Sequence, residues 1–328
     1  MNLKGVLIVP VVMLAIFFAT DILLRRVLAW LHHHAVLDRP VERSLHRAPT
    51  PRGGGLALIP VVLVAWALLG QSIGIVALAA GLAILSWRDD LHHVPVLWRL
   101  LAQLAAAAIG TYFFLDAGGG PVGFSPLWFE RALLALLWVW FTNLYNFMDG
   151  IDGITGIETA SLGGGIALVS ALGASTLADP LPALVLEAAS LAFLRWNWYP
   201  AVIFLGDVGS IPLGFLSGYL LIRLALLGFW ASALILPLYY LSDASVTLLG
   251  RILRGEPIWQ AHRLHFYQRA AASDGDHAAV ARIVLFGNLA LIALAALAIY
   301  RPLPALAAAG VVTVMMLAVL QIRAKRRV

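Results

Sequence analysis

Long apolar runs separated by short polar segments dominate this chain. Eleven such runs, most of them about 16–22 residues long, lie near residues 3–24, 54–70, 72–87, 98–115, 127–146, 155–173, 181–195, 209–227, 229–249, 279–299 and 303–322. A membrane-spanning helix needs about 20 mainly apolar residues, and several of these runs are shorter. The pattern predicts an all-α, polytopic integral membrane protein with about 11 transmembrane helices, and ten is the alternative count.

The basic residues predict how these helices are oriented. Loops on the cytoplasmic side of a membrane carry an excess of Lys and Arg. If the N-terminus lies outside, only four of the 22 Lys and Arg residues face outward, namely Lys4, Arg131, Arg223 and Arg301. We therefore expect the N-terminus outside and the C-terminus in the cytoplasm.

The composition agrees with a membrane protein. Hydrophobic residues make up 62% of the chain and charged residues 12%, whereas soluble domains have roughly 45–50% and about 25%. Barrel strands alternate apolar and polar residues, so the continuous runs favour helices. The chain has no cysteine, which excludes disulfides and thiolate metal sites. We interpret the net charge of +5 as a sign of topology and of lipid headgroups, with no nucleic acid as a partner.

The unusual polar residues lie on the inward side. We interpret residues 1–328 as a single membrane domain, with polar inward segments near 25–53, 87–98, 143–156, 195–209 and 250–280. The outward loops, such as DAGGGPVGFSP at 116–126, carry almost no charge. We expect the chemistry on the inward face.

Two adjacent acids, Asp89 and Asp90, end the third apolar run. A charged Asp at the middle of a membrane helix is costly, so we expect both at the interface. One interpretation is a solvated pair balanced by Arg88. The other is a functional pair, because mutual repulsion raises one pKa and suits that carboxylate to accept a proton.

The stretch NLYNFMDGIDGITGIE at 143–158 repeats a polar residue every third position. Such steps drift by about 60° around an α-helix, so all six polar residues cannot share one face unless the helix breaks near Asp149 and Gly150. A capping turn is the simple alternative. Two acids, Asp149 and Asp152, together with two carboxamides, Asn143 and Asn146, favour a site instead.

Asp207, in LGDVGS, precedes another apolar run. A helix N-terminus with small residues can bind an anion, and an Asp there can also be a simple N-cap. Together with Asp149 and Asp152, it would complete an all-oxygen site for Mg²⁺, which takes one or two carboxylates and fills its other positions with phosphates and water.

Two further motifs are weaker. His262 and His265 in HRLH lack a third ligand at zinc spacing, so we favour phosphate contacts, with solvated loop residues as the alternative. The glycines after Arg52 free backbone amides for phosphate, but glycine-rich runs are common and no Lys-Ser/Thr ending follows.

The order of these motifs resembles a known family. RSLHRAPTPRGGG, DD, NxxNxxDGIDG, GDVGS and HRLHFYQR, between about residues 43 and 269, are similar to the polyprenyl-phosphate N-acetylhexosamine-1-phosphate transferases. The resemblance implies a multi-pass enzyme of the bacterial inner membrane with a cytoplasmic active site. It would move a sugar-1-phosphate from a UDP-sugar to undecaprenyl phosphate and release UMP, with Mg²⁺ as cofactor and Mn²⁺ as a substitute.

The resemblance also implies roles for individual residues. By their motifs, the candidate catalytic residues are Asp89, Asp90, Asp149, Asp152, His262 and His265. The candidate metal ligands are Asp207, Asp149 and Asp152. The candidate substrate-binding residues are His46, Thr50, Arg52, Arg99, Asn143, Asn146, Asn197, Phe204 and Arg263. A phosphate monoester is already largely dianionic at neutral pH, so whether Asp89 is a base or positions the lipid phosphate stays open.

Departures from one branch of the family favour another. The DD pair is followed by LHHVPVLWR rather than a lysine-rich loop, and the histidines are split as HRLH. This pattern is most similar to the enzymes that begin O-antigen synthesis, with UDP-GlcNAc, UDP-GalNAc and UDP-FucNAc or UDP-QuiNAc all open as donors, and a homodimer open as well. The alternative is a transporter or flippase for a lipid-linked or anionic solute, since acids and broken helices also mark transport paths.

Overall fold

The structure is a computed structural model. It describes residues 3–40, 45, 48–115, 127–173, 179–257 and 262–325, with side chains described from Ile8 onward except that of Asp274. Everything below concerns these residues.

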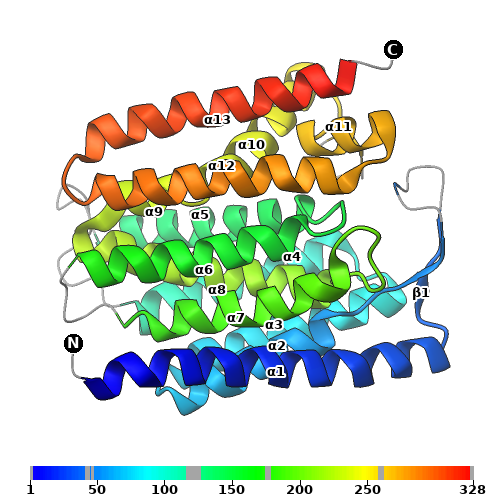
Figure 1. Ribbon diagram of the computed structural model, residues 1–328, viewed down its shortest axis with the longest axis horizontal. Coiled ribbons are helices and arrows are strands. Elements are labelled where there is room, and N and C mark those ends of the chain that lie inside the picture. The colour runs from blue at the N-terminus through cyan, green and yellow to red at the C-terminus, as the bar shows by residue number, and fades with distance from the viewer. Residues whose placement is uncertain are drawn as a thin grey trace.

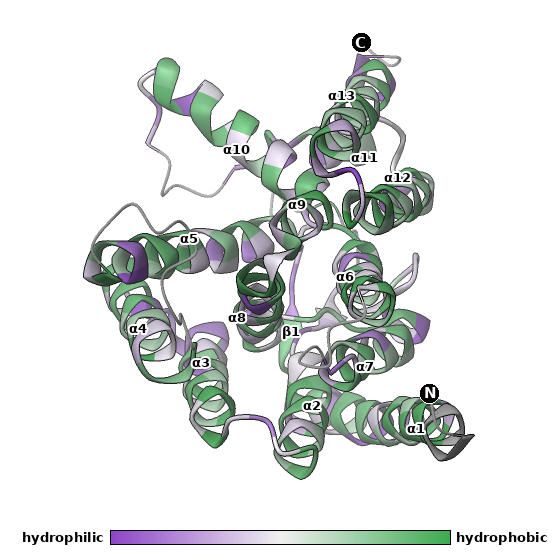
Figure 2. Ribbon diagram, turned by 90° about the vertical axis from the view of Figure 1, so that its left-hand side faces the viewer, coloured by the Kyte–Doolittle hydropathy of each residue, from purple (hydrophilic) through white to green (hydrophobic). Residues whose placement is uncertain are grey.

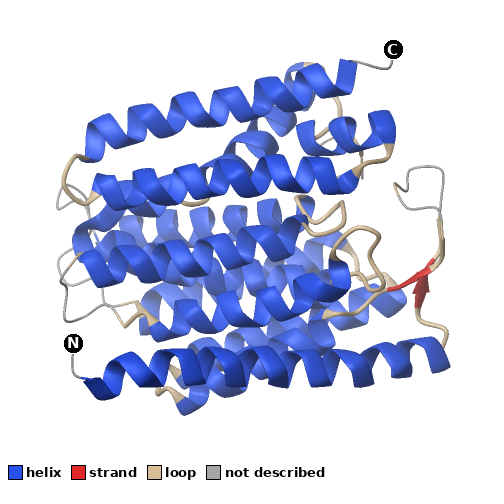
Figure 3. Cartoon of the chain, in the orientation of Figure 1, coloured by secondary structure: helices blue, strands red, loops and turns tan. Residues whose placement is uncertain are grey.

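The described chain forms a bundle of helices that run side by side, with two short strands at one end (Figures 1 and 3). The helices are α1 (Leu3–His33), α2 (Gly55–Leu68), α3 (Ile73–His92), α4 (Val96–Ile109), α5 (Leu127–Phe147), α6 (Ile154–Leu172), α7 (Leu181–Asn197), α8 (Asp207–Leu224), α9 (Trp230–Ile235), α10 (Leu238–Leu253), α11 (Phe266–Asp274), α12 (His277–Ala298) and α13 (Pro302–Lys325). The antiparallel strands are β1 (Leu37–Asp38) and β2 (Thr50–Pro51).

The all-α membrane class predicted from the sequence is confirmed. Within the described part of the chain, six helical segments are long and apolar enough to cross a membrane. They are Ile8–His33, Val96–Phe114, Ile154–Leu172, Asp207–Ile235, His277–Ala298 and Pro302–Lys325. The remaining predicted runs also fall on helices, but the count of eleven crossings stays a prediction.

One predicted span, 229–249, is two helices in the structure. Residues 236–237 separate α9 from α10, and proline has no backbone N–H with which to continue a helix. Before this break, α8 passes into a π-helical turn, η2 (Ala225–Phe229), in which Gly228 has a non-helical φ of 96°. A second π-helical turn, η1 (Gly110–Phe114), extends α4.

The two ends of the described chain lie at opposite ends of the bundle. The N-terminal end of α1 lies at the left of Figure 1, and the last turn of α13 lies toward the right, the side that also carries the strands.

Helix α8 lies at the centre of the bundle (Figure 2). Most of its residues are buried, and it packs against α5, α3 and α2. Its N-terminus touches α2 very closely, because a Cβ on Gly55 would lie 2.3 Å from the backbone N of Gly209. The central helix therefore fixes where its first residue, Asp207, lies.

Helix α10 projects from the rest of the bundle (Figure 2). Its outer face is apolar and exposed, at Val246, Leu249, Ile252 and Leu253. In a membrane protein such a face suits contact with lipid.

Candidate active site

The strands and the glycine run hold the start of α8 in place. The backbone N–H groups of Gly53 and Gly54 donate to the Phe204 carbonyl at 3.0 and 2.8 Å, and Gly55 donates to Leu205 at 2.9 Å. The backbone of Arg52 also pairs with that of Phe204 in an isolated parallel β-bridge. These three amides already donate within the fold, so they are not free to bind phosphate. The sequence-based suggestion that they would be free is therefore wrong.

Asp90 of α3 occupies the N-terminus of α8. Its carboxylate accepts the backbone N–H of Asp207 at 3.2 Å and of Val208 at 3.0 Å. Arg52 forms an ion pair with the same carboxylate at 2.9 Å. The anion site expected at this helix start is thus filled by the protein's own acid.

Asp89 has a different partner. It accepts the Val94 backbone N–H at 2.7 Å and pairs with Arg99 of α4 at 2.5 Å. Side-chain exposure is 7% for Asp89 and 2% for Asp90. The two acids are buried and paired, so the structure does not match the alternative of a solvated pair.

The helix break expected in NLYNFMDGIDGITGIE lies between α5, which ends at Phe147, and α6, which begins at Ile154. Gly153 has a φ of +80°, which favours glycine. A Cβ on Gly150 would lie 2.3 Å from the Tyr267 hydroxyl, which itself donates to the Phe147 carbonyl at 2.8 Å. Close approach by α11 therefore requires glycine in this turn.

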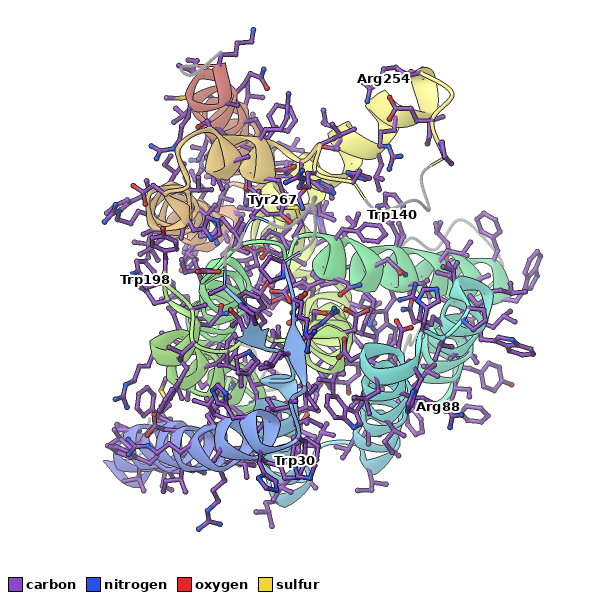
Figure 4. The ribbon with its side chains drawn as sticks, turned by 90° about the vertical axis from the view of Figure 1, so that its right-hand side faces the viewer. Trp30, Arg88, Trp140, Trp198, Arg254 and Tyr267 are labelled. Carbon is purple, nitrogen blue, oxygen red and sulfur yellow. The ribbon has the colours of Figure 1, made fainter. Side chains whose placement is uncertain are left out.

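A polar cavity of about 370 Å³ lies at the end of the bundle that carries the strands. Figure 4 looks onto that end and shows oxygen and nitrogen atoms gathered around the strands, with Tyr267 beside them. The lining residues come from segments far apart in the sequence: Asp38, Leu45, Arg52, Asn146, Asp149, Gly150, Ile151, Asp152, Asn197, Phe204, Leu205, Gly206, Asp207, His262, Arg263, Gln268 and His277.

The charges in this cavity are strongly coupled. Arg52 donates to Asp207 at 2.7 Å, and the acids around it hold its pKa above the ordinary value although burial lowers it. Removal from water is the main reason that the pKa of Asp149 rises to about 7, and Asp207 and Asp90 raise it further. The nearby Thr155 side chain and Arg52 oppose this rise. Acids from α3, α8 and the α5–α6 turn therefore face one another.

A second cavity, of about 440 Å³, adjoins the first. Its lining is mainly apolar: Leu82, Leu85, Ser86, Val96, Arg99, Leu100, Gln103, Leu136, Val139, Trp140, Asn143, Asn146, Phe147, Asp207, Ile211 and Leu248. Trp140 can be followed in Figure 4. Asn146 and Asp207 line both cavities, so a polar site meets an apolar one at these two residues.

The two carboxamides predicted as substrate-binding residues, Asn143 and Asn146, are held in place by hydrogen bonds. Asn143 donates to Gln103 at 2.5 Å and to the Val139 carbonyl at 2.8 Å. Asn146 accepts the Ser210 hydroxyl at 2.6 Å. Asn143 lines the apolar cavity, whereas Asn146 lies at the junction.

The HRLH motif divides between the cavity and the core. His262 and Arg263 line the polar cavity, and burial, with nearby cations, lowers the pKa of His262 to about 4. His265 is buried, 3.3 Å from Asp243. Asp243 also accepts the backbone N–H groups of Phe266 and Tyr267, so this cluster fixes the start of α11.

Asp152 points toward the loop that follows α7. Its carboxylate accepts the Ala201 N–H at 2.9 Å and lies 3.3 Å from Nδ1 of His277. Asn197 links the same loop to the α5–α6 turn, since it accepts the Gly153 N–H and donates to the Ile203 carbonyl, both at 2.9 Å.

The carboxylates that line the polar cavity are the kind of ligand that Mg²⁺ prefers. In the described part of the chain, no group of three or more acids and histidines converges as a metal site. Mg²⁺ needs only one or two carboxylates when water and phosphates complete its shell. Asp149 and Asp207 both line the cavity, and the charge of Asp207 acts on Asp149. The Asp152 carboxylate is bound by Ala201 and lies beside His277. Asp152 as a third ligand stays a prediction.

Of the predicted substrate contacts, Thr50 lines neither cavity. Thr50 is buried in β2 and donates to the Ala48 carbonyl at 3.1 Å. His46 falls outside the described residues. Of the other predicted site residues, Asp89, Asp90 and His265 act on cavity-lining groups rather than lining a cavity themselves.

The sequence analysis missed several residues of the site. Asp38, Gln268 and His277 line the polar cavity, Gln103 lines the apolar one, and Ser210 anchors Asn146. Gln268 lies in the HRLHFYQR motif and Ser210 in GDVGS, but neither residue was assigned a role. The others lack a local pattern, because their roles arise from contacts between distant segments.

Fold and site together define a class: an all-α membrane protein in which an acid- and arginine-lined cavity opens beside an apolar one. Residues 72–225 match the family model described as Glycosyl transferase family 4. The chain belongs to the polyprenyl-phosphate hexosamine-1-phosphate transferase superfamily, a group of phosphosugar transferases.

Three relatives illustrate this membership. A probable undecaprenyl-phosphate N-acetylglucosaminyl 1-phosphate transferase of Bacillus subtilis (strain 168) is 30% identical over 260 residues, which cover 74% of this chain and 71% of that protein. A phospho-N-acetylmuramoyl-pentapeptide-transferase of Moorella thermoacetica is 30% identical, covering 68% and 76%. A decaprenyl-phosphate N-acetylglucosaminephosphotransferase of Mycolicibacterium smegmatis is 31% identical, covering 55% and 51%.

Proposed function

We propose that this protein transfers an N-acetylated amino-sugar-1-phosphate from a UDP-sugar to undecaprenyl phosphate and releases UMP. An oxygen of the lipid phosphate attacks the β-phosphorus of the donor. The bond from that phosphorus to the oxygen bridging to the α-phosphate breaks, and UMP leaves with that oxygen. The product is a polyprenyl-diphosphate-sugar, and the step begins O-antigen or a related envelope glycan.

The observation that carries this proposal is the junction of the two cavities at Asn146 and Asp207. A lipid phosphate needs an apolar channel for its chain and a polar place for its head. The apolar cavity, between α3, α4, α5, α8 and α10, suits an isoprenoid chain. The polar cavity suits a nucleotide sugar, so the two substrates would meet at the junction.

Arg99 and Arg52 both pair with Asp207 at this junction. Arg99 lies 3.4 Å from Asp207 and also pairs with Asp89, and it lines the apolar cavity. A guanidinium suits phosphate oxygens because its donors are arranged in a fork. We assign Arg99 to the lipid phosphate, with Asp89 orienting Arg99 rather than acting as a base.

We propose Mg²⁺ as the cofactor, with Mn²⁺ as a substitute, held by Asp149 and Asp207. When bound, the ion would neutralise charge on the transferring diphosphate. Asn197, Phe204 and Asp152 would bind the nucleoside, and His262 and Arg263 would contact the sugar or phosphates from the loop before α11.

We further propose eleven crossings, an outside N-terminus and an active site that faces the cytoplasm of a bacterial inner membrane. The uneven distribution of Lys and Arg supports this orientation. The opposite positions of the two chain ends in Figure 1 agree with an odd number.

The transporter alternative receives less support. A transport path places its ionisable groups near the middle of the membrane. Here the acids and arginines of the cavities gather at one end of the bundle, beside the strands.

The test is a reaction with purified protein, undecaprenyl phosphate, Mg²⁺ and a panel of UDP-linked amino sugars, with UMP as the readout. At least one donor should yield UMP, and EDTA should abolish the signal until Mg²⁺ is restored. No UMP from any donor would overturn the enzyme, and release that EDTA leaves unchanged would overturn the metal.

A further inference from the structure

His277 is a buried histidine of the polar cavity that no motif had indicated. It is the first residue of α12 and is 3% exposed. The preceding residue, Asp276, accepts the Ala279 N–H at 2.9 Å and lies 3.7 Å from Arg323 of α13. The start of α12 is therefore anchored, and the imidazole is held at the cavity wall.

The imidazole contacts Asp152 at two atoms. Its Nδ1 lies 3.3 Å from the carboxylate Oδ1 and 3.4 Å from the backbone N of Asp152. An unprotonated Nδ1 accepts the backbone N–H, and a protonated one donates to the carboxylate. The other oxygen, Oδ2, accepts the Ala201 N–H at 2.9 Å. The Asp152 side chain is thus held from opposite sides.

This arrangement continues into the neighbouring wall. The next residue, Gly153, donates to Asn197, which in turn donates to the carbonyl of Ile203, one residue before Phe204. His277, Asp152 and Asn197 line the polar cavity, and none of them lines the apolar one. This wall therefore belongs to the part of the site that the lipid does not occupy.

We infer that His277 is a positioning residue for the nucleotide-sugar donor: it holds Asp152, and with it the wall that runs to Asn197, in the orientation that binds the nucleotide. The inference rests on the proposed function, since it assigns this wall to the donor. His277 acts through Asp152 and does not touch the reacting phosphorus.

The test separates donor binding from catalysis. With purified full-length protein, His277→Ala should raise the KM for the UDP-sugar about 10-fold, as expected when a hydrogen bond to a charged group is lost. The kcat and the KM for undecaprenyl phosphate should change less than about 3-fold, because the apolar cavity and the junction are untouched.

Two variants serve as controls. His277→Asn places an amide nitrogen the same number of bonds from Cα as Nδ1, so it should restore the donor KM to within about 3-fold of wild type. His33→Ala removes an exposed histidine at the end of α1 and should leave all constants unchanged.

A binding measurement with UMP and no lipid makes the test independent of turnover. His277→Ala should weaken UMP binding by a factor similar to the rise in donor KM. An unchanged donor KM and UMP affinity would overturn the inference. Equal losses toward donor and lipid, with no rescue by Asn, would also overturn it, because they indicate a merely structural residue.

The outcome separates this inference from the proposed reaction. A wild-type protein that turns over normally beside an unaffected His277→Ala variant overturns only the role of His277. If the wild type releases no UMP from any donor, the proposed reaction fails, and UMP affinity alone still decides whether His277 shapes a nucleotide site.

Discussion

At the scale of single residues, the site is an arrangement of acids around two arginines. Arg52 bridges Asp90 and Asp207, and Arg99 bridges Asp89 and Asp207. Among the described residues, Asp207 is the acid that contacts both arginines and lines both cavities. Under the proposed reaction, the charge of its carboxylate would act directly on a bound metal and on substrate phosphates.

Asp207→Asn should lower turnover at least about 100-fold, because it removes a full charge from the place where phosphate charge and metal would meet. Folding should be retained, since Arg52 keeps Asp90 as a partner and Arg99 keeps Asp89. The measurement is the rate of UMP release, together with the thermal midpoint in detergent.

Asp179→Asn is the matched control, because Asp179 is an exposed acid that lines neither cavity and accepts the Leu181 N–H at the start of α7. It should keep near-normal turnover. Substantial activity in Asp207→Asn would remove Asp207 from the centre of the site.

The sequence predicts which side chains are present at this site better than it predicts their tasks. Asp149, Asn146 and Asp207 lie in recognisable motifs, and all three line the polar cavity. Asp90 caps α8 across 117 positions of sequence, and Asp152 binds a histidine 125 positions away. Such contacts depend on how distant helices pack, so a local sequence pattern cannot predict them.

At the scale of elements, α2 and α8 meet through glycines at their N-termini. A Cβ on Gly55 would overlap the backbone of Val208 and Gly209. Backbone atoms cannot rotate away as a side chain can, so the two helices would have to separate. The start of α8, with Asp207 and its cap from Asp90, would move as a result.

Gly55→Ala should therefore destabilise the protein by about 1–3 kcal/mol, the usual cost of overpacking a well-packed core. It should also lower turnover, because Asp207 shifts. Thermal unfolding in detergent and UMP release measure the two effects.

Gly81→Ala is the control within another helix. A Cβ on Gly81 in α3 meets nothing within 4 Å, and alanine favours the helix by roughly 0.5–1 kcal/mol over glycine. Gly81→Ala should be neutral or slightly stabilising. A Gly55→Ala protein as stable and active as Gly81→Ala would contradict the close helix contact.

The positions of the helices can be predicted from the sequence because a helix that lies in lipid must be mainly apolar along its length. Breaks between two helices inside one apolar run are harder to predict from the sequence. The run at 229–249 reads as one span, yet it divides at Pro237, and α10 turns away from the bundle. A single proline changes helix direction without changing hydrophobicity, so hydropathy alone cannot locate the bend.

At the scale of the whole molecule, the account requires that the strand end of the bundle face the cytoplasm. The natural chain has no cysteine, so single cysteines report topology without background. Tyr300, between α12 and α13, is 69% exposed and lies on the predicted outer side. His33, at the end of α1, lies on the predicted inner side.

Tyr300→Cys should react with a membrane-impermeant thiol reagent in intact cells, whereas His33→Cys should react only after lysis. The reason is that the last turn of α1 and the connection between α12 and α13 lie at opposite ends of the bundle (Figure 1). Labelling of His33→Cys in intact cells, with Tyr300→Cys protected, would reverse the orientation.

We propose that this enzyme transfers a sugar-1-phosphate, and not a bare sugar, to a lipid phosphate, with the two substrates bound in the two cavities. The most direct measurement uses a UDP-sugar with radioactive phosphorus at the β-position, undecaprenyl phosphate and Mg²⁺, followed by extraction of the lipid. The label should enter the lipid fraction while unlabelled UMP stays in water. Label that remains in water as UDP, beside a sugar-bearing lipid, would contradict it.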